Sequence, residues 1–127
     1  MVSHQARNSS TEKWQVIAGW FLTLSYVIGA PVYAIIEANS GLFSERFDYS
    51  PGFLYLVSIV QFACALVLFV RSLAPWASAI LTALALGAVY SHVSIGSPLT
   101  SLPAIAYVFI QIWYGIRIYR QNQEKST

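Results

Sequence analysis

Residues 53–70 read FLYLVSIVQFACALVLFV and residues 74–91 read APWASAILTALALGAVYS, with only Arg71-Ser72-Leu73 between them. Neither run contains a charged side chain. An apolar run of about 17–25 residues is long enough to cross the hydrocarbon core of a bilayer as a helix. Because lipid cannot hydrogen-bond a bare backbone, each run should be helical. The short link then predicts that the two helices are antiparallel neighbours.

Two further apolar runs flank this pair, Trp14–Ile36 before it and Leu102–Ile118 after it, with Arg117 the single charged residue in either. We expect spans at 14–37, 53–70, 74–92 and 102–119 in a bundle that covers 14–120, with polar tails at 1–13 and 121–127. Asn39-Ser40-Gly41 marks the end of the first helix. Ser50-Pro51 is typical of an N-cap and a first helical residue. The sequence predicts an all-α, integral membrane four-helix bundle.

The composition excludes several other classes of protein. Hydrophobic residues make up 57% of the chain and charged residues 9%, whereas about a quarter of the residues of a soluble domain are charged. A net charge of +2 is too small to indicate a nucleic-acid partner. The single cysteine, Cys64, cannot form an internal disulfide and is expected to be a small buried side chain. The Cys/His spacing of a zinc site is absent, so no metal is expected.

The distribution of positive charge predicts the orientation in the membrane. Six of the seven lysines and arginines lie in the two tails, at the end of the fourth run or in the link between the second and third; these are Arg7, Lys13, Arg71, Arg117, Arg120 and Lys125. Arg46 alone lies in the other two loops. The positive-inside rule therefore predicts cytoplasmic termini in a bacterial inner (plasma) membrane. An even number of spans agrees with this orientation.

Polar side chains recur on the inner faces of the expected helices. The set comprises Tyr26, Tyr33, Glu37, Gln61, His92, Tyr107 and Gln111. At 1.5 Å per residue, Gln61 and Gln111 should lie at a similar depth, roughly 12–15 Å below the outer surface, and Tyr26 should reach the same level. We expect a slot lined by two amides and several phenols, which opens outward past Glu37 and His92.

Two interpretations of this slot remain open. In the structural one, the glutamines hydrogen-bond across helices, at about 0.6 kcal/mol per bond, and the tyrosines anchor the helices at the membrane surface. In the functional one, the slot holds a flat lipophilic molecule with polar ends, such as a quinone. Gln or Tyr side chains would then donate to its carbonyl oxygens, while Glu37 or His92 carried protons. The chain has no catalytic motif, so we do not expect it to be an enzyme on its own.

A row of small residues on the third expected helix predicts a packing face. Ala79, Ala83, Gly87 and Ser91 recur every four residues, and such rows let two membrane helices approach closely. We expect this helix to be the centre of the bundle, with Gly87→Leu destabilising it.

Several short segments between residues 49 and 92 resemble a known family. They are Tyr49-Ser50-Pro51, Phe53-Leu54-Tyr55-Leu56, Gln61, Arg71, Leu86-Gly87-Ala88 and His92. Together they resemble the DoxX-like family of small four-helix membrane proteins. The chain departs from the family pattern at Gln61, where relatives often have a glutamate, and at Ser58, where they often have a glycine. Gln61 cannot carry a proton as that glutamate could.

The resemblance implies an accessory component of membrane redox metabolism, with quinone or lipid contact inside the bundle, because relatives have been linked to membrane-bound oxidoreductases and quinone-dependent sulfur oxidation. The alternative is a structural or assembly subunit without a ligand, which packs through the third helix. A small transporter is a third alternative, although four spans with so little polarity would need to oligomerise to form a pore. Expected partners are membrane lipids and either another membrane protein or a second copy of the chain.

Overall fold

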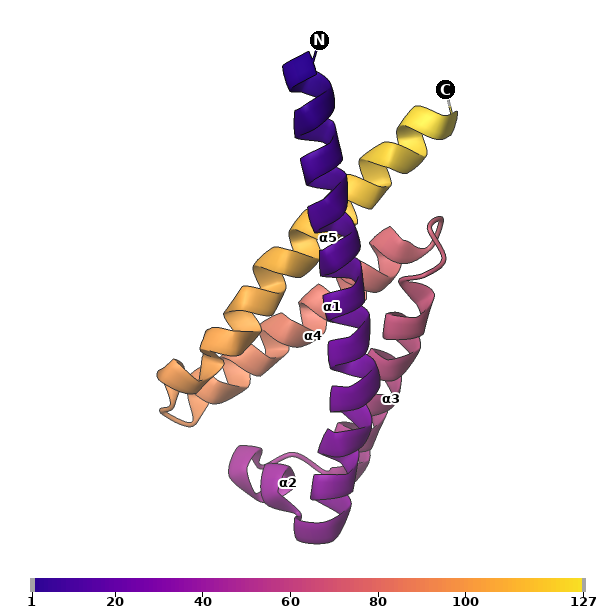
Figure 1. Ribbon diagram of the computed structural model, residues 1–127. Helices are drawn as coiled ribbons and strands as arrows, with labels where there is room; N and C mark the ends of the chain where they lie inside the picture. The colour runs from indigo at the N-terminus through magenta and orange to yellow at the C-terminus, as the bar shows by residue number, and fades with distance from the viewer. Residues whose placement is uncertain (1, 127) are drawn as a thin grey trace.

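The protein is an assembly of helices with no strand in the part of the chain that the structure describes (Figure 1). The computed structural model describes residues 2–126, and the side chains of residues 10–125. Its elements are α1 (Val2–Ser40), α2 (Leu42–Phe47), α3 (Pro51–Val67), α4 (Ala74–Ser94), the 3-10 helix η1 (Pro98–Ser101) and α5 (Leu102–Ser126).

The helix boundaries confirm two predictions and extend two others. Gly41 ends α1 with a φ of 64°, a left-handed conformation that glycine adopts without steric cost. Ser50 caps α3, since its Oγ accepts a hydrogen bond from the Phe53 amide at 3.2 Å. The polar tails, however, continue the helices: α1 begins at Val2 and α5 ends at Ser126. Met1 and Thr127, the outermost residues of the two expected tails, lie outside the described residues.

Three helical segments are long and apolar enough to cross a membrane: residues 10–40, 74–94 and 98–125. The remaining helix, α3, is apolar but has 17 residues, about 25 Å of helix. The apolar run continues past its end as turns, because Phe69 and Val70 donate to the carbonyl groups of Leu66 and Val67. The expected second span is therefore the shortest of the four.

The long helices form two pairs that cross. The main partner of α1 is α3, and the main partner of α4 is α5. Although α3 and α4 are consecutive and in contact, as the link predicted, each shares more of its surface with its main partner. Figure 1 shows both termini at one end, while the pairs separate towards the other end, where α2 lies. We call these the terminal end and the α2 end.

The hydrophobic core lies where the two pairs meet. It consists of the buried residues Leu22, Cys64, Leu68, Ala74, Ala77, Leu81, Tyr114 and Ile118, so Cys64 is buried as expected. α4 and α5 approach each other closely at Gly115. A Cβ atom placed there would lie 2.9 Å from Ser78 Oγ and 3.0 Å from Ser78 Cβ. Ser78 Oγ also donates a hydrogen bond to the Gln111 carbonyl oxygen.

The predicted packing row lies on a different face of α4 from this contact. Ala79, Ala83 and Gly87 are exposed, and no atom lies within 4 Å of a Cβ atom built on Gly87. Because the two pairs separate at the α2 end, this face of α4 turns towards the gap. The small residue that meets α5 closely is Ser78, and sequence spacing alone did not distinguish the two faces.

Candidate ligand cavity

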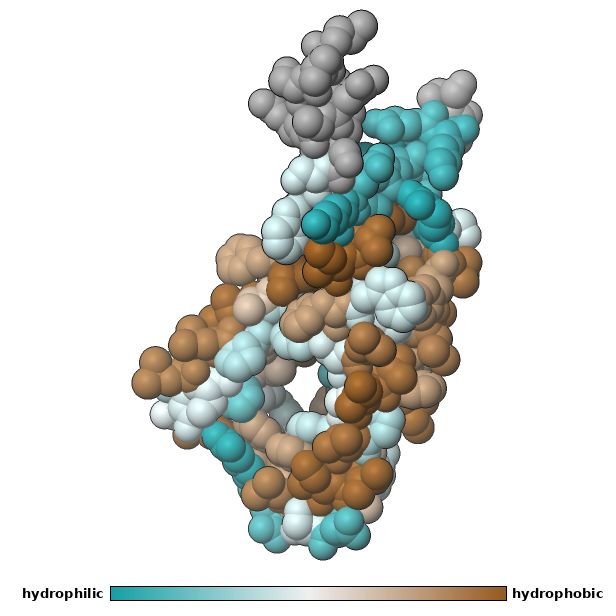
Figure 2. Space-filling view, viewed as in Figure 1, coloured by the Kyte–Doolittle hydropathy of each residue, from teal (hydrophilic) through white to brown (hydrophobic). Residues whose placement is uncertain are grey.

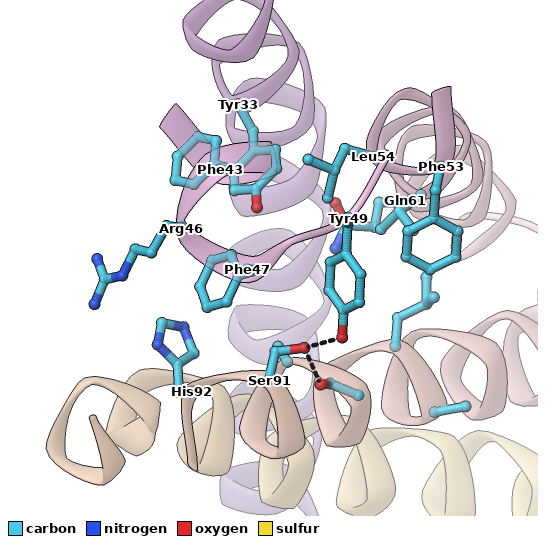
Figure 3. Close-up of a pocket in the computed structure, with 15 residues that line it drawn as sticks. Tyr33, Phe43, Arg46, Phe47, Tyr49, Phe53, Leu54, Gln61, Ser91 and His92 are labelled. Carbon is cyan, nitrogen blue, oxygen red and sulfur yellow. Dashed lines mark hydrogen bonds between the residues drawn. The ribbon is translucent and has the colours of Figure 1, made fainter. Parts of the chain in front are cut away.

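A cavity of about 290 Å³ occupies the space between the two helix pairs at the α2 end. Figure 2 shows the molecule hollowed there, and Figure 3 shows the side chains around the cavity. The lining residues come from α1, α2, α3, α4 and the segment after α2; they are Tyr33, Phe43, Arg46, Phe47, Tyr49, Phe53, Leu54, Val57, Gln61, Ala83, Leu84, Gly87, Ala88, Ser91 and His92. Most of this lining is apolar.

The short helix α2 is held in place by Glu37. The Glu37 carboxylate accepts hydrogen bonds from the amide groups of Phe43, at 2.8 Å, and Ser44, at 3.1 Å. These amides belong to the first turn of α2, where an acceptor with negative charge is favourable. Glu37 is 3% exposed and is not among the cavity residues. The structure thus places this predicted rim residue behind α2, as its cap.

Aromatic contacts tie α2 to the helices on either side of the cavity. Tyr33 on α1 stacks on Phe43, with ring centroids 3.8 Å apart and an interplanar angle of 10°. Phe47 meets His92 on α4 edge to face, with centroids 5.0 Å apart. Figure 3 shows these rings around the cavity. Because α2 contacts both helix pairs, it covers the space between them.

Tyr49 connects the segment after α2 to α4. Its hydroxyl lies 2.7 Å from Ser91 Oγ, and Ser91 Oγ donates to the Gly87 carbonyl oxygen at 2.9 Å (Figure 3). A hydroxyl has one proton, so Tyr49 donates and Ser91 accepts. Ser91, which was predicted to pack against a helix, instead supports this wall of the cavity.

Three polar side chains line the cavity and have groups that a ligand could bind. The Gln61 amide, in the middle of α3, makes no hydrogen bond within the described residues. His92 shares a hydrogen bond of 2.7 Å between its Nδ1 and Thr100 Oγ1, so Nε2 is the ring nitrogen available to a ligand. The Arg46 guanidinium lies 5.5 Å from the centre of the Phe47 ring. An amide within the cavity and two nitrogen groups from α2 and α4 suit a ligand with separated oxygen atoms.

The second glutamine of the predicted slot lies elsewhere. Gln111 is fully buried and is not a cavity residue. Its Nε2 donates to the Tyr26 hydroxyl, and the Tyr26 ring lies 5.6 Å from the Tyr107 ring. Gln111 Oε1 has no partner among the described residues. The structure therefore separates the predicted set: Tyr33, Gln61 and His92 line the cavity, whereas Tyr26, Tyr107 and Gln111 form a partly buried contact between α1 and α5.

Sequence reasoning missed a polar cluster at the terminal end. Gln15 and Gln121 exchange two hydrogen bonds of 2.9 Å between α1 and α5. Arg117 Nε donates to Gln15 Oε1 at 3.2 Å, and Arg71 donates to Gln121 Oε1. We call these four residues the amide–arginine cluster. No spacing rule pairs residues 106 positions apart, so the sequence alone contained no signal for this contact.

Comparison with known proteins identifies the family. A sequence model of the DoxX-like family matches residues 15–115. The chain belongs to the DoxX-like family. The match extends beyond residues 49–92, which carry the family-like segments, and includes α1 from Gln15 onward. Every cavity residue of this DoxX-like protein lies within the matched range. No curated protein and no solved structure matches the chain.

Proposed function

We propose that this DoxX-like protein crosses a bacterial inner membrane four times, with both termini in the cytoplasm. Three apolar helices of sufficient length, a shorter fourth helix, and termini at one end support this arrangement. The charge asymmetry selects the orientation. Reporter fusions after Thr127 and near Ser44 should report opposite compartments. A reporter at Thr127 that is active in the periplasm would overturn the proposed topology.

We further propose that the cavity holds a lipophilic ring with oxygen atoms at opposite ends, a quinone being the chemical class that fits best. The observation that carries this proposal is the Gln61 amide, which lies without a hydrogen-bond partner, within the described residues, in a mainly apolar cavity of about 290 Å³. Ligand sites are usually apolar spaces of about 300–1,000 Å³ with a few placed polar groups. The cavity is close to the lower limit, which suits a single ring.

The polar groups of the cavity supply donors for both ends of such a ring. In this arrangement the Gln61 Nε2 group donates to one carbonyl oxygen, and the Arg46 guanidinium donates to the other. The Thr100 hydroxyl gives its proton to the Ser97 carbonyl and so accepts from His92 Nδ1, which leaves Nε2 of the neutral ring as an acceptor for a hydroxyl of the reduced ring. The aromatic rings of Tyr33 and Phe47 bound the space between these donors. The role assigned to the chain is to bind the quinone as an accessory component of membrane redox metabolism, in association with a partner that transfers the electrons.

The two glutamines provide a matched test. Quinone titration, followed by quenching of tryptophan fluorescence, should show binding to the parent protein and affinity about tenfold weaker in Gln61→Leu. Gln111→Leu should keep the parent affinity, because Gln111 is not a cavity residue, while losing thermal stability. Absence of binding in the parent, or equal affinity in Gln61→Leu, would remove the quinone proposal.

A second candidate function is a structural or assembly subunit without a ligand. It is favoured by the open face of α4, where Ala79, Ala83 and Gly87 are exposed. Small residues of this kind permit close packing of a helix from a partner or a second copy. Gly87→Leu should then abolish association in mild detergent without lowering the stability of the single chain. A parent protein that is extracted as a monomer, free of other proteins, would eliminate this candidate.

A further inference from the structure

A second hollow lies on the outer surface of the protein, in the groove between α1 and α5. Its volume is about 520 Å³, and it shares no residue with the candidate ligand cavity. Trp14, Ile17, Ala18, Phe21, Phe109, Ile110 and Trp113 line it. Its walls are almost entirely apolar and aromatic, and Trp14 is 62% exposed. We call it the α1–α5 groove.

Positive side chains extend both walls of the groove towards the terminal end. Lys13 lies four residues before Ile17, so it is on the groove side of α1. Arg117 lies four residues after Trp113, and Arg120 seven residues after it, on the groove side of α5. Both chain ends lie at the terminal end, so the three cations are expected at the same end of the groove.

Arg117 is held in place at this position. Its guanidinium lies 5.6 Å from the centre of the Trp113 ring, which lines the groove. Its Nε donates to Gln15, and Gln15 is fixed by its two hydrogen bonds with Gln121. The two Nη groups of Arg117 make no hydrogen bond within the described residues. The amide–arginine cluster thus positions a guanidinium with free donors above an apolar groove.

The acidic residues of this end are displaced from Lys13 and Arg117. Glu12 precedes Lys13 and projects about 100° away from it around the helix. Glu124 is on the side of α5 that carries Arg117, but seven residues beyond it, about 10 Å along the axis, and it lies one turn after Arg120. The part of the groove nearest the terminal end therefore carries a net positive charge, from Lys13 and Arg117.

We propose that the α1–α5 groove is a binding site for an anionic phospholipid. The acyl chain lies against the tryptophan and phenylalanine side chains, and the phosphate accepts hydrogen bonds from the free Nη groups of Arg117, with Lys13 and Arg120 nearby. Charge selects this occupant over a zwitterionic lipid, since basic residues at a membrane surface each favour anionic lipids measurably. The apolar groove binds the acyl chain of a phospholipid, which inorganic phosphate lacks, so phosphate alone should bind more weakly.

Thermal unfolding of the full-length protein in detergent tests the site with three probes. Phosphatidylglycerol should raise the unfolding temperature, whereas phosphatidylcholine with the same chains and inorganic phosphate at the same concentration should not. In native mass spectrometry the parent should retain one phosphatidylglycerol. Equal stabilisation by the two phospholipids, or by phosphate alone, would overturn the proposal.

Variants locate the site on the surface. Lys13→Gln should weaken phosphatidylglycerol binding about fivefold, as expected for one basic residue, and Arg117→Gln should weaken it at least as much. Lys13 takes no part in the hydrogen bonds of the amide–arginine cluster, so its variant remains informative if Arg117→Gln unfolds. Lys125→Gln is the control with the same charge change beyond the groove, and it should leave binding unchanged. An equal loss in Lys125→Gln would mean diffuse attraction rather than a site.

Discussion

The two ends of this DoxX-like protein differ in how the same two helix pairs are held together. At the terminal end, small side chains let α4 and α5 approach until Gly115 meets Ser78, and the amide–arginine cluster joins α1, α5 and the link before α4. At the α2 end, the helix pairs separate around a cavity. The terminal end is therefore tightly packed and hydrogen-bonded, whereas the α2 end has room for a ligand.

The residue types at each end explain the difference. Glycine and serine at the α4–α5 contact have no bulk to keep the helices apart. At the other end, the chain between α1 and α3 contributes Phe43 and Phe47, whose rings lie between the pairs and contact Tyr33 and His92. The aromatic rings of α2 hold the pairs apart and also form part of the cavity wall.

The largest expected effect distinguishes the two ends by adding the same side chain to each. Gly115→Leu should lower the free energy of unfolding by about 3 kcal/mol, because the contact with Ser78 leaves no space for a Cβ atom. Gly87→Leu should leave stability nearly unchanged, since the space around Gly87 is open. Thermal unfolding in detergent measures both. Equal losses would contradict the distinction between the packed and open ends.

The next effect concerns the partly buried contact between Gln111 and Tyr26. Gln111→Leu should lower the free energy of unfolding by about 1–2 kcal/mol, because it leaves the Tyr26 hydroxyl without its hydrogen-bond partner. Adding Tyr26→Phe should restore part of that loss, since the orphaned hydroxyl is removed as well. The unfolding temperatures of the two single variants and the double variant measure the coupling between Gln111 and Tyr26. Strict additivity would mean that the two side chains do not depend on each other.

A smaller and more local effect is expected where Glu37 caps α2. Glu37→Gln removes the negative charge that faces the amides of Phe43 and Ser44, so exchange of these two amide hydrogens should become on the order of ten times faster. Unfolding temperature should change little, because α2 is remote from the hydrophobic core. Glu45→Gln is the control on α2 itself. Identical exchange in both variants would show that Glu37 does not hold α2.

The smallest expected effect is at the terminal end. Gln15→Leu should lower the free energy of unfolding by about 0.6 kcal/mol, the average for a polar contact between membrane helices. The double variant Gln15→Leu with Gln121→Leu should lose less stability than the sum of the two single variants, because the two amides bond each other and only the bond from Arg71 to Gln121 is lost in addition. Unfolding in detergent again provides the measurement. A loss of several kcal/mol in the single variant would mean that the amide–arginine cluster, and not the apolar core, holds this end closed.

The sequence predicted those features that depend on neighbouring residues. The uncharged apolar runs predicted the helices, Ser50-Pro51 predicted the start of α3, and Gly41 predicted the end of α1. Gln61 and His92 were expected beside an inner space, and both line the cavity. In each case the physical cause is local: helix period, capping, or the cost of a polar group in lipid.

Features that depend on how helices cross were not predictable in this way. Depth along a helix placed Gln61 and Gln111 at one level, but depth does not determine the rotation of each helix about its axis, and the two side chains face different spaces. The same limitation applies to α4, where two adjacent faces both contain small residues. The capping of α2 by Glu37 needs a reversal of the chain at Gly41 that brings residue 37 to the amide of residue 43, which helix period cannot show.

The pairing of the helices also has a consequence for biosynthesis. The partners α4 and α5 are adjacent in the chain, and α1 and α3 are separated only by α2. Each pair can therefore assemble as soon as its own segments have entered the bilayer, in the order in which they are synthesised. The bonds between Gln15 and Gln121 join the first and last helices, so they cannot form until residue 121 has been synthesised. A chain that stops before residue 121 retains both helix pairs but leaves the Gln15 amide without its partner at the terminal end.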